Sequence, residues 1–175
     1  MREWNLTYAD PMAPRIAADA RGGRTVYGDD QTWQLRLGPP SETAMALETR
    51  YGGRVGLARV VPIWTLGRRQ VIEAQGYHQP PALVAFAPDY LRVQAGLTLA
   101  LDVRAEFWAM ESQAVGGRFT LTNTGDQPQS VRLDLAVQAA REGKELQVFF
   151  LTLEDRSVAL QLGRLRGLQP VLLLE

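Results

Sequence analysis

The feature that most constrains the fold is a strict alternation of apolar and polar residues on both sides of a turn, between Gly117 and Gln138. Phe119 and Leu121 alternate with polar residues before the turn. After it, four larger aliphatic residues alternate with Arg132, Asp134, Ala136 and Gln138: Val131, Leu133, Leu135 and Val137. Successive side chains of a strand point to opposite faces, so each segment has one face for a core and one for solvent. Asn, Gly, Asp and Pro between residues 123 and 128 are typical turn residues. The stretch therefore predicts a strand, a turn and a second strand.

The same alternation predicts further strands along the chain. Residues 45–51 and 55–61 read as a hairpin around Gly52-Gly53, with Pro62 ending its regular part. The other predicted strands cover residues 32–37, 82–86, 97–108 (one long strand), 146–153 (a central strand, since both of its faces are apolar), 158–162 and 171–174. Residues 67–90 are expected to be the least regular region. The predicted fold is all-β: a two-layer antiparallel β-sandwich, supersandwich-like, of about nine to twelve strands with little helix.

The length of 175 residues suits one domain, which we place at residues 1–175. Residues 1–31 lack a strand or helix period and are predicted to form an irregular N-terminal arm, anchored by Trp4, Tyr8 and Tyr27. An apolar, strand-forming stretch comes directly before the last residue, and domains usually close with polar termini. We therefore expect the chain to be the N-terminal part of a longer polypeptide.

The composition excludes several classes of function. No cysteine is present, which rules out disulfides, thiolate metal sites and cysteine nucleophiles and fits a reducing compartment. Basic and acidic residues number 19 each, and Lys144 is the only lysine, so we expect no nucleic-acid partner. No apolar run approaches the ~18 residues of a membrane span, and residues 1–10 contain no signal core. We expect a cytoplasmic protein with neither a membrane partner nor a cofactor.

Few residues are candidates for chemistry. His78 is the only histidine, and a single histidine does not make a metal site, so we predict none. The carboxylates Asp29-Asp30, Glu106, Glu111 and Glu154-Asp155 cannot be paired from the sequence, and turn or solvent-facing roles explain them. Neither a phosphate-binding loop nor a nucleophile elbow is present. We assign no catalytic residue.

The aromatic residues are more informative. Trp108 lies on the polar side of its predicted strand beside Glu106, where an exposed ring can stack on a sugar or cover a partner domain. Trp64 and Tyr77 lie in the irregular stretch that follows the first hairpin. These four residues are our candidates for carbohydrate binding or domain docking. The alternative for each aromatic ring is burial against a neighbouring sheet.

Three segments resemble one known group of proteins: Tyr27–Trp33 (YGDDQTW), Leu47–Gly52 (LETRYG) and Gly117–Asn123 (GRFTLTN). They look like the N-terminal β-sandwich of bacterial proteins similar to glycogen-debranching enzymes, in which a supersandwich precedes an (α/α)6 barrel. In that group the catalytic carboxylates belong to the barrel, so the resemblance implies no catalytic residue here. Aldose mutarotases use the same supersandwich but rely on histidines with a carboxylate, and the single His78 argues against that activity.

The resemblance implies a non-catalytic accessory domain of a carbohydrate-active protein, glycoside-hydrolase-like or glycogen-debranching-like. Its expected partners are a C-terminal catalytic-type domain of the same polypeptide and an oligosaccharide. One alternative is a stand-alone sandwich that serves as an interaction or structural module without a sugar ligand, for example as a homo-oligomer. Another is a free-standing enzyme, which would need Glu106 and Glu111 to converge in a cleft.

Overall fold

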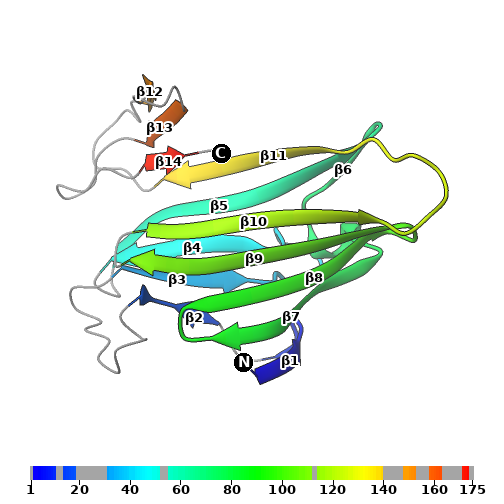
Figure 1. Cartoon of the computed structure of the whole chain (residues 1–175), viewed down its shortest axis with the longest axis horizontal. Coiled ribbons are helices and arrows are strands. Elements are labelled where there is room, and N and C mark those ends of the chain that lie inside the picture. Colours follow the sequence, from blue (N-terminus) through cyan, green and yellow to red (C-terminus); the bar gives the residue numbers. More distant parts are fainter. Residues whose placement is uncertain are drawn as a thin grey trace.

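The computed structural model describes residues 2–10, 14–18, 31–51, 55–111, 114–139, 148–152, 158–162 and 171–173. These residues form fourteen β-strands and one short 3₁₀ turn, and no α-helix occurs among them. The strands lie in antiparallel sheets packed in layers (Figure 1). The predicted all-β antiparallel sandwich is therefore confirmed, with more strands than predicted.

Sheet A forms one layer of the sandwich. Its strands follow the order β1-β7-β8-β9-β10. They are β1 (Arg2–Leu6), β7 (Gln79–Ala87), β8 (Tyr90–Thr98), β9 (Leu101–Glu111) and β10 (Ala114–Asn123). Strands β7 to β10 follow one another in sequence and in space, so this layer is an antiparallel meander that β1 extends at one edge (Figure 1).

Sheet B forms the second layer, in the order β11-β5-β4-β3-β2, with β6 paired to β5. Its strands are β2 (Arg15–Ile16), β3 (Gln31–Arg36), β4 (Ala46–Tyr51), β5 (Val55–Leu66), β6 (Arg69–Val71) and β11 (Arg132–Ala139). The 3₁₀ turn η2 (Ala74–Gly76) leads from β6 to β7. The predicted hairpin around Gly52-Gly53 is confirmed as β4 and β5, although the two glycines themselves lie outside the described residues.

A third, smaller sheet has the order β12-β13-β14. It consists of β12 (Val148–Thr152), β13 (Val158–Leu162) and β14 (Val171–Leu173). The predicted strand over residues 146–153 is present as β12, but its predicted central position was wrong, since among the described strands β12 lies at the edge of this sheet and β13 at its centre. Apolar residues on both faces of a strand favour burial of both faces. They do not specify how many neighbouring strands pair with its edges.

The core lies between sheets A and B. On β9 the residues facing sheet B are buried: Leu101, Val103, Ala105, Phe107 and Ala109. Trp64 of β5 crosses the interface and meets Phe119 of β10 edge-to-face, with ring centroids 5.5 Å apart. We call the side of sheet A that faces these residues its inner face, and the opposite side its outer face.

The strands on either side of the turn at residues 124–131 do not pair with each other. The first is β10, which pairs with β9 in sheet A, and the second is β11, which pairs with β5 in sheet B. The turn therefore carries the chain from one layer to the other. Asn123 shapes its start, since its Oδ1 accepts a hydrogen bond from the Gly125 backbone N–H at 3.1 Å. Alternation predicted two strands with one buried face each, but it does not specify the pairing partner.

The predicted long strand over residues 97–108 is confirmed from Leu101 onwards as β9, but its continuity through residues 97–100 was wrong. The structure has a tight hairpin at this place, with Thr98 paired to Leu101 and Leu99 at the tip. Leu97 and Leu101 are buried, whereas Leu99 is 85% exposed. The turn contains no Gly, Pro, Asn or Asp, so the usual sequence signal for a hairpin is missing.

The two regions predicted to be irregular contain strands. Residues 1–31 include β1, paired with β7, and β2, paired with β3. Trp4 packs edge-to-face on Phe86 of β7, with ring centroids 6.4 Å apart, and anchors this segment as predicted. Tyr8 is 46% exposed, and Tyr27 lies outside the described residues. Residues 67–90 contain β6 and the nine-residue β7, a longer strand than predicted.

Strand β5 continues through Pro62, which was expected to end it. Pro62 pairs with Leu135 of β11, and it lies beyond the last residue of β5 that pairs with β4, namely Val60. At Pro62 only the edge of β5 that faces β11 has a paired residue among the described strands, so a residue without an N–H is tolerated there. The strand therefore extends to Leu66 and carries Trp64 into the core.

Candidate functional site

Two of the four predicted site residues lie in the core. Trp64 is fully buried and donates its Nε1–H to the Tyr77 hydroxyl at 3.0 Å, and Tyr77 is 4% exposed. Burial raises the pKa of the Tyr77 hydroxyl, and the hydrogen bond from Trp64 opposes this only in part. Without exposed surface, neither ring stacks on a ligand or a partner domain. The role predicted for these two residues is therefore corrected to packing.

The other two predicted residues, Glu106 and Trp108, lie on the outer face of sheet A. Strand β9 runs between β8 and β10, so each outer-face residue of β9 has one neighbour on either side. The register sets up four rows across the three strands: Tyr90–Trp108–Gly116, Arg92–Glu106–Arg118, Gln94–Arg104–Thr120 and Gly96–Asp102–Thr122. Successive rows are about 7 Å apart, since each residue of an antiparallel strand advances about 3.4 Å.

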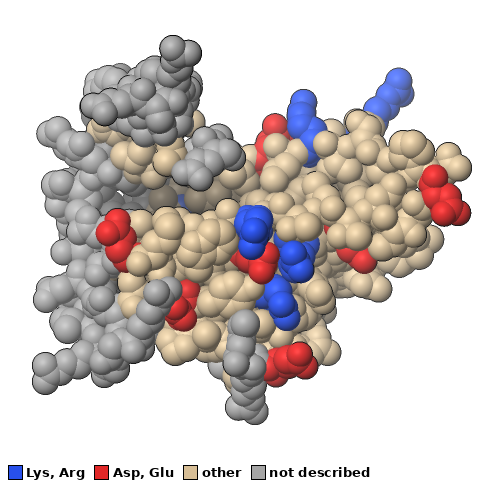
Figure 2. Space-filling view, in the orientation of Figure 1, with Lys and Arg blue, Asp and Glu red and all other residues tan. Residues whose placement is uncertain are grey.

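Glu106 is the centre of a charged cluster. Tyr90 donates its hydroxyl to Glu106 Oε1 at 2.7 Å, while the Nε atoms of Arg104 and Arg118 each lie 3.5 Å from Oε2. Arg92 occupies the position directly across the strand from Glu106. Glu106 is only 8% exposed, although it belongs to the outer face, because these longer side chains surround it. In Figure 2, basic side chains gather beside an acidic one in the middle of this face.

The surroundings of Glu106 keep its carboxylate ionised. The hydrogen bond from Tyr90 lowers the pKa of Glu106, and the charges of the three arginines act in the same direction against the opposing effect of burial. The pKa of Tyr90 is raised, first by burial and then by the hydrogen bond to Glu106. Glu106 is therefore an acceptor and a fixed negative charge at neutral pH, and Tyr90 stays a neutral donor.

Trp108 lies across Gly116 of the neighbouring strand. A Cβ atom at position 116 would come within 2.5 Å of Cε2 and Nε1 of the indole, so only glycine leaves room for the ring at this place. The guanidinium carbon of Arg118 is 5.9 Å from the centroid of the same ring, within the range of a cation–π contact. Trp108 is thus partly exposed and held between a backbone surface and a cation.

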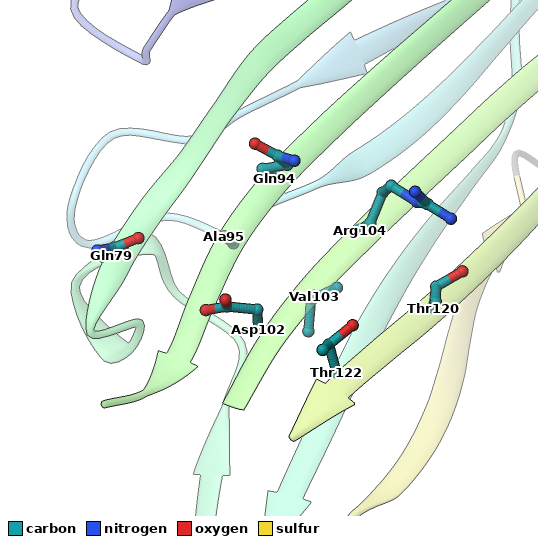
Figure 3. Close-up of a pocket in the computed structure, with 8 residues that line it drawn as sticks. All are labelled: Gln79, Gln94, Ala95, Asp102, Val103, Arg104, Thr120 and Thr122. Atoms are coloured by element: carbon teal, nitrogen blue, oxygen red, sulfur yellow. The ribbon is translucent and has the colours of Figure 1, made fainter. Parts of the chain in front are cut away.

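A shallow groove of about 270 Å³ adjoins this cluster. Six of its lining residues carry polar side chains and come from four neighbouring strands: Gln79, Gln94, Asp102, Arg104, Thr120 and Thr122. Figure 3 shows the Asp102 carboxylate on the side of β7 and the Arg104 guanidinium on the side of β10. The groove therefore offers hydroxyl, amide, carboxylate and guanidinium groups within one depression.

The carboxylates of β9 are spread along the strand. Asp102 and Glu106 are four residues apart on one strand, which places their Cα atoms about 13 Å from each other. The carboxyl pairs of glycosidases are about 5–9.5 Å apart. Glu111 is exposed at the end of β9, five residues beyond Glu106, and does not converge with it. The Cα spacing of Asp102 and Glu106 is therefore wider than the carboxyl spacing of such a pair.

The remaining sequence candidates lie elsewhere. His78 is exposed in the bend before β7, as expected for a loop histidine. Asp29-Asp30 and Glu154-Asp155 lie outside the described residues. Within the described part of the chain, no three His, Asp or Glu side chains gather in a way that could hold a metal ion.

Sequence reasoning missed four residues that lie around Glu106 and Trp108: Tyr90, Arg92, Gly116 and Arg118. Arg118 was on the polar side of its predicted strand, but its distance from Glu106 depends on the register of β9 with β10. Gly116 gave no signal by itself, because its role is to leave space for the indole of the neighbouring strand. A predicted β9–β10 hairpin with a fixed register would have brought Gly116 opposite Trp108 and Arg118 opposite Glu106.

No helix among the described residues has the length and apolarity needed to cross a membrane. Comparison of the chain with protein-family models, with curated proteins and with solved structures gives no significant match. The resemblance to the sandwich of debranching-enzyme-like proteins therefore stays a prediction.

Proposed function

We propose that this chain is a non-catalytic accessory domain of a carbohydrate-active protein and that the outer face of sheet A contacts oligosaccharide. The observation that carries the proposal is Trp108, a partly exposed indole held across Gly116 on the same outer face as a polar groove, with the row of Glu106 between them. An indole supplies apolar area at a low cost in conformational entropy, and it can pack on the C–H face of a sugar ring. Amide, hydroxyl and carboxylate groups in the groove can bind sugar hydroxyls.

The charges on this face support binding in preference to catalysis. The pKa of Glu106 is lowered, and its carboxylate already accepts a hydrogen bond from Tyr90. A general acid needs the opposite shift, towards a raised pKa. The groups on the outer face can therefore orient a ligand, while a catalytic-type domain of the same polypeptide would supply the chemistry.

Titration of the chain with maltooligosaccharides and glycogen, monitored by calorimetry or NMR, tests the proposal. We expect saturable binding with NMR shifts confined to the four rows around Trp108. Trp108→Ala should abolish binding, and Gly116→Val should weaken it by pushing the indole out of place. Trp4→Ala is the matched control, since it removes an indole from the edge strand β1 of the same sheet, which two strands separate from β9. Melting curves of each variant check that the fold is retained.

Absence of binding to any saccharide would overturn the sugar-contact role. Two roles without a sugar ligand would then remain for this face. It could dock on a partner domain of the same polypeptide, or it could be the contact surface of a stand-alone interaction module. Binding that survives Trp108→Ala, with shifts on another surface, would also contradict the assignment of the site.

A further inference from the structure

The cluster around Glu106 contains more positive than negative charge. Three guanidinium groups, those of Arg92, Arg104 and Arg118, surround one carboxylate, whereas the chain as a whole has a net charge of zero. One carboxylate neutralises one of the three cations, so the cluster has a surplus of two positive charges. Asp102, the other acidic residue of the rows, lies about 7 Å further along β9 than Arg104.

The two arginines that contact Glu106 keep much of their binding capacity. Both Nε···Oε2 distances are 3.5 Å, longer than the roughly 2.7–2.9 Å of a charge-assisted hydrogen bond. The side chains of Arg104 and Arg118 are 46% and 65% exposed. Glu106 therefore gathers the guanidinium groups without saturating their hydrogen-bond donors.

We propose that the outer face of sheet A binds an anionic saccharide, whose carboxylate or phosphate group is held by Arg104 and Arg118 while a sugar ring packs on Trp108. Guanidinium groups bind carboxylates and phosphates through paired hydrogen bonds, which a neutral hydroxyl cannot match. Arg118 links the two halves of the site, since it contacts Glu106 at one side and the Trp108 ring at the other. This inference rests on the proposed function and adds the charge of the ligand to it.

A second arginine–glutamate group on sheet B provides an internal comparison. There Glu48 pairs with Arg36 at 3.1 Å and lies within 3.7 Å of Arg59. Arg36 lies on β3 and Arg59 on β5, both in sheet B, so neither belongs to the cluster around Glu106 on sheet A. Arg36→Gln therefore serves as a control that removes a similar arginine without touching the proposed site.

The experiment is a set of NMR titrations with a short oligogalacturonate, a maltooligosaccharide of the same length, glucose 6-phosphate and inorganic phosphate. We expect an acidic saccharide to bind about tenfold more tightly than the neutral one at low ionic strength. The preference should shrink at high salt, because the Debye length falls to about 3 Å at 1 M. The oligogalacturonate and glucose 6-phosphate arms distinguish a carboxylate from a phosphate ligand.

In the double variant Arg104→Gln/Arg118→Gln the preference should disappear, while Arg36→Gln leaves it intact. If the double variant does not fold, Arg104→Lys/Arg118→Lys keeps the charges, and loss of most of the preference is expected, since the paired geometry is lost. Equal affinity for acidic and neutral saccharides would overturn this inference and leave the proposed function standing. Binding of inorganic phosphate as tightly as glucose 6-phosphate, unaffected by Trp108→Ala, would overturn the saccharide part. Absence of binding in every arm would overturn both proposals.

Discussion

Each face of sheet A has a tryptophan against it, in opposite settings: Trp64 of β5 in sheet B packs on the inner face, and Trp108 of β9 lies on the outer face. On the inner side, Trp64 has no exposed surface, and Tyr77 and Phe119 surround its indole. On the outer side, the indole of Trp108 is partly exposed between Gly116 and Arg118. Both tryptophans were plausible ligand contacts in the sequence. The difference lies in the neighbours, because packing partners fix one ring in the core while a glycine and a cation hold the other at the surface.

The same contrast holds for the polar groups. Inside the core, the Nε1–H group of Trp64 and the hydroxyl of Tyr77 are paired by one neutral hydrogen bond. Glu106 instead is surrounded by arginines that remain half exposed. The polar groups at the inner face are therefore paired inside the core, whereas the arginines of the outer face keep exposed hydrogen-bond donors. This division can be tested by comparing matched substitutions on the two faces.

The largest expected effect comes from replacing the two tryptophans. Trp64→Ala leaves a cavity in the core and removes the donor to Tyr77, so the free energy of unfolding should fall by about 3–5 kcal/mol. Trp108→Ala removes a partly exposed ring and its cation–π contact, and the loss should be about 1 kcal/mol. Urea unfolding followed by far-UV circular dichroism measures both values. Similar losses for the two variants would show that the outer ring is as much a part of the core as the inner one.

An intermediate effect is expected from two adjacent glycines that face opposite sides of β10. A Cβ at Gly117 would lie 3.1 Å from Phe107 in the core, and one at Gly116 would lie 2.5 Å from the Trp108 ring. Phe107 is packed edge-to-face on Phe119 and cannot move away easily, so Gly117→Ala should destabilise the fold by about 1 kcal/mol. Gly116→Ala should displace Trp108 with little loss of stability, since that ring can turn into solvent.

Tryptophan fluorescence together with thermal melting separates the two outcomes. We expect Gly116→Ala to shift the emission maximum, because the environment of Trp108 changes, and to leave the melting temperature nearly unchanged. Gly117→Ala should lower the melting temperature and leave the emission maximum nearly unchanged. A melting temperature that falls more for Gly116→Ala than for Gly117→Ala would show that the packing of Trp108 stabilises the fold. That result would contradict the proposed difference between the inner and outer faces.

Much of the fold followed from the sequence, because alternation reports which face of a strand is buried. It located β3, β4, β5, β10, β11 and β13, and it placed Trp108 and Glu106 on the polar side of β9. It failed where pairing depends on the path of the chain. The turn after Asn123 crosses between layers, and the tip at Leu99 has no turn residue, so neither feature has a local signal.

The candidate site was harder to predict than the fold, because its members meet only across strands. Arg92 and Arg118 reach Glu106 through the registers of β8 and β10, which the tight turn after Thr98 and the irregularity between Ala114 and Val115 determine. A shift of one residue in either register would send these arginines to the inner face. The burial of Trp64 depends in turn on β5 continuing past Pro62. Both features are tertiary, and a single sequence does not specify them.

The smallest expected effect is the response of the outer face to acid. The folded pKa of Glu106 lies below the ordinary value, so the unfolded chain binds the proton more readily. Its contribution to stability is therefore complete above a pH of about 4.5 and is lost as the pH falls through that value towards the folded pKa. In Glu106→Gln the free energy of unfolding should depend less steeply on pH in this range. Tyr90→Phe should reduce the slope as well, since the hydrogen bond from Tyr90 is the main cause of the shift.

Urea unfolding of these variants between pH 3 and pH 6 measures the slope, with Glu111→Gln as the control for losing an exposed carboxylate from the same strand. An unchanged slope in Glu106→Gln would mean that the arginines do not stabilise the charged form in the folded state. Glu106 would then not be the group that holds Arg104 and Arg118 in place, and the positively charged cluster would lack the contact that assembles it. A reduced slope would instead show that Glu106 is charged and coupled to the fold, which is the condition for a permanently assembled arginine cluster on this face.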